Sequence, residues 1–178
     1  MVPAVRSTLD VALWMHFRAE SAGEALAAHK LQRMLYLSQA HYAGEHRGGK
    51  LMPATFLATE GGPMEPNIFQ LFELGTPANA VADPPASIED FLMGLWEKYR
   101  TKAPDALLDI IRGDAAFALA FKQGPLSEIT VDMMTAAYGG GTGQEVKSMP
   151  KADADRVYWT NSGKAATKWI PGQKRPKD

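Results

Sequence analysis

The chain has 178 residues, a formal net charge of −1 and no cysteine. Without cysteine it can carry neither a disulfide scaffold, nor a thiol nucleophile, nor a Cys-ligated zinc or iron–sulfur site. Its length and its 46% hydrophobic content are typical of one soluble globular domain. No segment approaches the roughly 18 consecutive apolar residues of a membrane span, and residues 1–6 lack the pattern of a signal peptide. These features predict a cytoplasmic protein with no membrane partner.

The charges are distributed unevenly along the chain. Residues 1–143 contain 11 Lys and Arg against 16 Asp and Glu, a balance of −5, whereas residues 144–178 contain 8 against 4, a balance of +4. The first region is an acidic body and the second a basic tail. Glycine occupies four of the five positions from 139 to 143, which is typical of a linker. We therefore expect a helical domain over 7–138, followed by a Gly-rich linker and tail over 139–178.

Hydrophobic periodicity predicts two helices in the first 45 residues. Thr8 is the expected N-cap of the first, whose apolar residues recur at spacings of three and four. That stripe consists of Leu9, Leu13, Trp14 and Phe17. The second helix is expected from His29 to about Ala43, with its apolar residues on one face. Its other faces carry Lys30, Gln32, Arg33 and Gln39.

A short β-prone segment follows at residues 54–59, and Gly61–Pro63 is expected to form a turn. Pro66 stands at the first-turn position of a short helix that Gly75 ends. Ser87 begins a variant of the capping box and is expected to open a further helix. Three more helices are expected, one from Pro104, one over 115–121 and one over 131–138 with Thr130 as its N-cap. The fold class is mostly α, a compact multi-helix domain with a small β-hairpin or short strands.

The tail contains two β-prone segments, 156–160 and 165–170, around an Asn-Ser-Gly turn. They predict a further hairpin, and a helix from Asn161 is the alternative. Trp159 and Trp169 stand among basic residues here, a composition also found where single-stranded nucleic acid is bound. Because the charge excess is small and acidic residues lie nearby, nucleic-acid binding is the less favoured function.

The chain carries no pattern typical of a metal centre or a catalytic site. Among its four histidines, only His41 shares a helix face with a carboxylate, that of Glu45, and an exposed histidine near a helix C-terminus is the simpler interpretation. Neither the glycine run nor residues 162–164 fits the spacing of a phosphate-binding loop, and no serine stands in a nucleophile motif. The acidic pair Glu89 and Asp90 fits a solvated helix face better than acid/base catalysis. We predict a non-enzymatic protein with no cofactor and no metal.

Two segments look like motifs of one known family. Residues 30–41, KLQRMLYLSQAH, resemble the KLQKLLYYAQA helix of the Panacea domain family, which includes SocA-like antitoxins and phage GepA-like proteins. Residues 56–66, FLATEGGPMEP, resemble its FEAWxxGPVxP segment. In this chain, as in the family, a short helix with phenylalanine residues follows the second segment.

Two further segments occur in the order expected for that family. Residues 91–99 are similar to its VWxxYG helix, and residues 106–108 to its ELSxLTH helix. The resemblance covers residues 9–138. The chain departs from the pattern at Thr59, where the family has Trp, and at Met64, where it has Val.

The resemblance implies an antitoxin that neutralises a protein toxin by direct binding, with the toxin encoded nearby on a phage or mobile element. Some SocA-like members also deliver the toxin to the ClpXP protease, so a proteolytic adaptor is an alternative. A nucleic-acid-binding regulator that uses the basic tail is another. The candidate partner-binding residues are Gln32, Arg33, Tyr36, Gln39, Glu60, Gly62, Pro63, Met64, Glu65, Trp159 and Trp169. Structural roles are the stronger expectation for the motif residues. Contacts are expected from the tail or from exposed Gln32, Arg33, Glu60, Met64 and Glu65.

Overall fold

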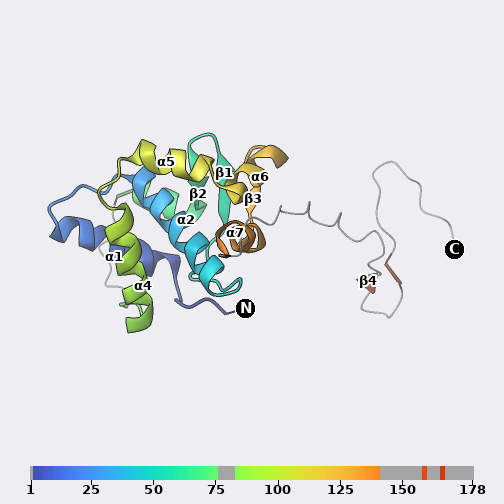
Figure 1. Ribbon diagram of the computed structural model, residues 1–178, viewed down its shortest axis with the longest axis horizontal. Coiled ribbons are helices and arrows are strands. Elements are labelled where there is room, and N and C mark those ends of the chain that lie inside the picture. The colour runs from blue at the N-terminus through green and yellow to red at the C-terminus, as the bar shows by residue number, and fades with distance from the viewer. Residues whose placement is uncertain (1, 76–82, 141–157, 160–164, 167–178) are drawn as a thin grey trace. The chain divides into compact units, whose positions relative to one another are not determined.

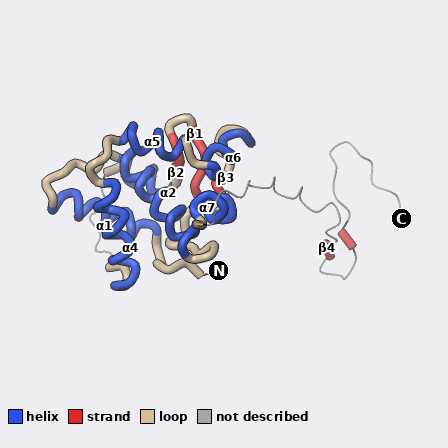
Figure 2. The backbone as a smooth tube through the Cα atoms, in the orientation of Figure 1, coloured by secondary structure: helices blue, strands red, loops and turns tan. Residues whose placement is uncertain are grey.

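The computed structural model of the chain describes residues 2–75, 83–140, 158–159 and 165–166. These residues form seven helices and five short strands (Figure 1). The chain divides into two units, residues 1–144 and 145–178. Helix dominates the described part of the first unit (Figure 2), so the predicted fold class is confirmed. Within the described ranges, every helix is too short or too polar to cross a bilayer.

The helices of the first unit follow the order expected from the sequence. They are α1 (Thr8–Ser21), α2 (Ala28–Glu45), α3 (Pro66–Glu73), α4 (Ala86–Tyr99), α5 (Pro104–Arg112), α6 (Ala115–Gln123) and α7 (Val131–Tyr138). The strands of this unit are β1 (Phe56–Thr59), β2 (Gly62–Met64) and β3 (Glu128–Ile129).

Helix α2 lies at the centre of the unit and contacts α1, α3, α4, α5, α7 and β2 (Figure 1). Every residue from Leu31 to Ala40 is buried. The faces that carry Gln32, Arg33 and Gln39, expected to be distinct from the apolar face, are therefore buried as well, because neighbouring elements cover all sides of α2 over residues 31–40. A helix that is buried all round must satisfy its polar side chains internally.

The β1–β2 hairpin is extended by a third strand. The sheet order is β2-β1-β3, with both pairs antiparallel. The turn consists of Glu60 and Gly61, and Gly62 already belongs to β2, so the tight turn predicted over 61–63 is displaced by one residue. Gly62 has φ +110°, and a Cβ there would lie 3.0 Å from the Leu108 side chain, which explains why glycine stands at this position. Strand β3 is only two residues long and the sequence did not predict it.

Several helix boundaries agree with the sequence and three details do not. Pro66 and Pro104 stand in the first turns of α3 and α5, and the Thr130 hydroxyl caps α7 by accepting from the Met133 amide at 3.3 Å. The cap of α1 is Ser7, not Thr8. Helix α4 begins directly after Pro85, without the predicted Ser87 cap. Phe17 is 48% exposed, whereas Leu13 and Trp14 of the same α1 stripe are buried.

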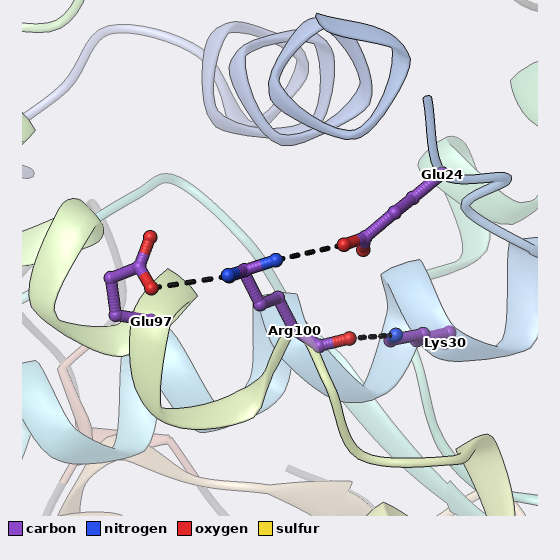
Figure 3. A network of polar contacts seen from close by, with 4 residues as sticks. All are labelled: Glu24, Lys30, Glu97 and Arg100. Atoms are coloured by element: carbon purple, nitrogen blue, oxygen red, sulfur yellow. Dashed lines mark hydrogen bonds and ion pairs between the residues drawn. The ribbon is translucent and has the colours of Figure 1, made fainter. Parts of the chain in front are cut away.

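A polar network of four residues surrounds Arg100 (Figure 3). The Arg100 guanidinium at the end of α4 pairs with Glu97 at 3.1 Å and with Glu24 at 2.8 Å. Lys30 Nζ donates to the Arg100 carbonyl. The network joins the α1–α2 connection, the start of α2 and the end of α4. Because the Arg100 side chain is paired on both sides, we assign this cluster a structural role.

The second unit contains one described strand pair. Strands β4 (Tyr158–Trp159) and β5 (Ala165–Ala166) pair antiparallel, with Tyr158 opposite Ala166 and Trp159 opposite Ala165. This pairing agrees with the predicted tail hairpin. The alternative helix start at Asn161, the candidate residue Trp169 and most of the linker lie outside the described residues.

Candidate functional site

Gln32 joins α2 to the exit of the β-hairpin. Its side-chain Oε1 accepts from the Glu65 amide at 2.7 Å, and its Nε2 donates to the Glu65 carbonyl at 3.4 Å. The Glu65 carboxylate in turn caps α3 by accepting from the Ile68 amide at 2.7 Å. Gln32 and Glu65 are both buried. Their predicted exposure is wrong, because both side chains are consumed in fixing this connection.

Gln39 performs the same task about two turns later along α2. Its Oε1 accepts from the amides of Leu51 and Met52 at 3.1 and 3.2 Å, and its Nε2 donates to the Gly49 carbonyl at 3.4 Å. Gln39 is also buried. The side-chain amide of Gln39 supplies hydrogen bonds to the backbone of residues 49–52 that a neighbouring β-strand would otherwise provide. Buried backbone groups need such partners.

Tyr36 belongs to a buried polar cluster between α2, α6 and α7. Its hydroxyl donates to the Asp114 carboxylate at 3.0 Å, and the Tyr138 hydroxyl donates to the same oxygen at 2.9 Å. The other oxygen of Asp114 caps α6 by accepting from the Phe117 amide at 2.6 Å. Burial raises the pKa of Asp114, which these hydrogen bonds oppose. Tyr36 is fully buried, so we assign it a structural role.

Arg33 holds the turn of the hairpin from inside. Its Nη2 donates to the Gly61 carbonyl at 3.0 Å, while Asp105 lies 3.8 Å from Nη1. The Arg33 side chain is only 6% exposed and that of Asp105 is 98% exposed. Burial lowers the pKa of Arg33. The negative charge of Asp105 raises this pKa, and the positive charge of Arg112 lowers it further. Nε and Nη1 of Arg33 have no hydrogen-bond partner among the described residues. The predicted exposure of Arg33 is therefore wrong, and its charge is poorly compensated.

A second guanidinium holds the same turn from the outside. Arg112, at the end of α5, donates from Nη2 to the Glu60 carbonyl at 3.1 Å. Glu60 itself is exposed, as predicted. The two arginines thus hold the two carbonyl groups of the turn, which gives the tip of the hairpin a defined position.

A groove of about 620 Å³ lies between this turn and α6. Its lining consists of Thr59, Glu60, Arg112, Phe117, Ala118, Phe121 and Lys122. The rings of Phe117 and Phe121 stack with centroids 5.7 Å apart, and Phe121 is 43% exposed. Arg112 and Lys122 are exposed and form no ion pair among the described residues. We define these seven residues as the α6 groove.

The α6 groove contains one of the residues selected from the sequence, Glu60. Gly62 and Pro63 are buried in β2, and Met64 is half-buried. The contribution of α6 was not expected from the sequence, although the spacing of four between Phe117 and Phe121 already places both rings on one helix face. Nothing about the apolar α6 segment distinguished a groove wall from a core element.

His41 is a half-buried structural residue. Its Nε2 lies 2.8 Å from the Tyr99 hydroxyl. Burial, with a smaller effect of Lys98, lowers the pKa of His41 to about 4, so the ring is neutral at pH 7. The expectation of an exposed histidine at the helix end is wrong. Across residues 2–75 and 83–140, no group of three acidic or histidine side chains is arranged to hold a metal ion.

No protein-family model matches this chain, no curated protein matches it, and no solved structure matches it.

Proposed function

We propose that this chain is a non-enzymatic, antitoxin-like protein that neutralises a protein toxin by direct binding. The α6 groove is the observation that carries the proposal. An exposed aromatic side chain, Phe121, lies beside a turn that two arginines hold in place. Aromatic and arginine side chains in a preformed hollow are typical of the residues that dominate the binding energy of protein interfaces.

The resemblance to the Panacea domain family supports the same function. The two segments that carry it, residues 30–41 and 56–66, are hydrogen-bonded to each other through Gln32 and Arg33. Together they form the frame that positions the turn. A shared frame with a divergent surface is what we expect of related proteins that bind different partners.

The test is co-expression with the neighbouring open reading frame. We expect a toxic neighbour whose toxicity this chain suppresses and with which it co-purifies. Phe121→Asp should abolish both effects, because it places a charge on the apolar floor of the α6 groove. Leu74→Asp is the matched control, since Leu74 is 83% exposed and does not line the groove. The proposal would be refuted if the neighbour is toxic and the wild-type chain neither suppresses its toxicity nor binds it.

The same system separates the two alternatives. A proteolytic adaptor would shorten the half-life of the partner in cells that contain ClpXP, whereas a sequestering antitoxin would leave it unchanged. A nucleic-acid-binding regulator would shift oligonucleotide mobility, with an affinity that falls steeply with salt and disappears when residues 144–178 are deleted.

A further inference from the structure

The α6 groove is a cationic site on an acidic body, and we propose that it receives an acidic segment of the partner, with Glu or Asp side chains next to an apolar residue. The inference rests on the proposed function, because it names the chemistry of the protein that would occupy this groove. It is carried by the charges around the hairpin turn, by the lack of compensation for them, and by the apolar floor between them.

Positive charge is concentrated around the α6 groove. Residues 1–143 have a balance of −5, yet Arg112 and Lys122 line the groove and Arg33 lies behind its turn. Arg112 is close enough to Arg33 to disfavour the charged form of that guanidinium. Like charges brought together at the surface favour a ligand of opposite charge.

The positive charges of the α6 groove and of Arg33 are poorly compensated within the described part of the chain. Neither Arg112 nor Lys122 forms an ion pair there. Among the described residues, Asp105 is the only acidic residue within ion-pair distance of Arg33, at 3.8 Å. The Asp105 side chain is 98% exposed. The Arg33 guanidinium is buried behind the turn and does not line the groove, so its charge adds to the positive potential there, while Arg112 and Lys122 are the groups that a carboxylate can reach.

The lining of the α6 groove suits a peptide better than a nucleic acid. The rings of Phe117 and Phe121 form an apolar floor that suits an aliphatic or aromatic side chain. Glu60 stands in the same lining and repels a continuous phosphate backbone, whereas a peptide can present an amide or an apolar residue at that point. Carboxylates spaced along a peptide therefore fit the lining better than phosphodiesters do.

The experiment selects ligands without knowledge of the natural partner. The full chain is immobilised and a random peptide library is selected against it. Recovered peptides are then labelled and titrated by fluorescence anisotropy. We expect them to contain Glu or Asp next to an apolar residue. Replacing Arg112 and Lys122 by Glu should weaken their binding by roughly tenfold or more, which corresponds to about 1.4 kcal/mol. Added salt should weaken it too.

Matched variants separate loss of charge from loss of fold. Lys102→Glu makes a charge change of the same kind at an exposed residue outside the groove and should leave affinity unchanged. Lys122→Glu alone should weaken binding severalfold while the thermal midpoint stays the same. It serves as the second variant because Arg112 also holds the Glu60 carbonyl.

Three results of the binding experiments would overturn the inference. They are selected peptides without acidic residues, unchanged affinity after both charge reversals, and displacement of the peptides by a single-stranded oligonucleotide at equal charge concentration. Toxin rescue that persists in the double charge-reversal variant would leave the proposed function standing and reject the acidic segment. Acidic peptides that bind a chain unable to rescue any neighbour would reject the proposed function alone.

Discussion

Replacing Gly44 by Ala should destabilise the protein, although the same replacement in an exposed helix interior stabilises one. Gly44 lies in the last turns of α2, where this helix packs against α7. A Cβ at position 44 would lie 2.5 Å from both the carbonyl carbon and the carbonyl oxygen of Tyr138. Ordinary contacts between such atoms are about 3.5–4.0 Å, so α7 would have to retreat by roughly 1 Å.

The size of the loss follows from two opposing effects. Ala is favoured over Gly inside a helix by about 1 kcal/mol. Inserting a methyl group into a packed site costs about 1–3 kcal/mol, and the upper value applies here because the opposing atoms are backbone and cannot rotate away. The net loss in the free energy of unfolding is therefore about 2 kcal/mol, or about 4–8 °C in the thermal midpoint.

Gly94 supplies the control for this prediction. It lies in the middle of α4, and a Cβ there would meet no atom within 4 Å. Gly94→Ala should therefore stabilise the protein by up to about 1 kcal/mol. Urea denaturation followed by tryptophan fluorescence measures both variants, with unchanged m-values as the check that only stability has altered. If the two glycines respond in the same direction, the described α2–α7 packing is wrong.

Three further outcomes follow from the buried polar groups. Because the pKa of His41 falls to about 4 in the folded state, the contribution of His41 to stability is complete above pH 6.5 and is lost as the pH falls toward 4. The expected loss is about 1–2 kcal/mol after allowance for partial exposure. Thermal denaturation at pH 6.5 and pH 4 should show this loss, and His41→Gln should reduce it. Gln39→Leu leaves two buried amides without an acceptor and should cost about 2–4 kcal/mol, with faster hydrogen exchange of those amides. Tyr36→Phe or Tyr138→Phe removes a hydrogen bond to Asp114, which should cost about 1–2 kcal/mol and raise the pKa of Asp114 further in a carbon-13 NMR titration.

Much of the fold could be predicted because its signals are local. Prolines at the first helical position mark the starts of α3 and α5, and the Thr130 cap marks the start of α7. Strand β3 could not be predicted, because two residues carry no periodicity and are defined only by their pairing with β1.

The candidate site was predicted less well. The sequence selected Glu60 as a candidate contact but placed the turn at 61–63, and it did not indicate the groove wall supplied by α6, which meets β1 only through the fold. It also assigned Gln32, Arg33 and Glu65 to the surface, because polar residues are mostly exposed in proteins. That rule fails for Gln32 and Arg33 in α2 and for Glu65 at the start of α3, since each of these side chains bonds to backbone or caps a helix.

The sequence by itself determined the order of the helices, the hairpin and the division into an acidic body and a basic tail, because propensity, capping and charge are properties of neighbouring residues. Only the tertiary structure decided that α2 is enclosed on every side over residues 31–40 and that two arginines from distant segments hold one turn beside two stacked phenylalanines. Burial and charge compensation depend on residues far apart in the chain. For that reason the polar residues of α2 became internal supports, and Arg112, Phe121 and Lys122 became the surface that we propose for binding.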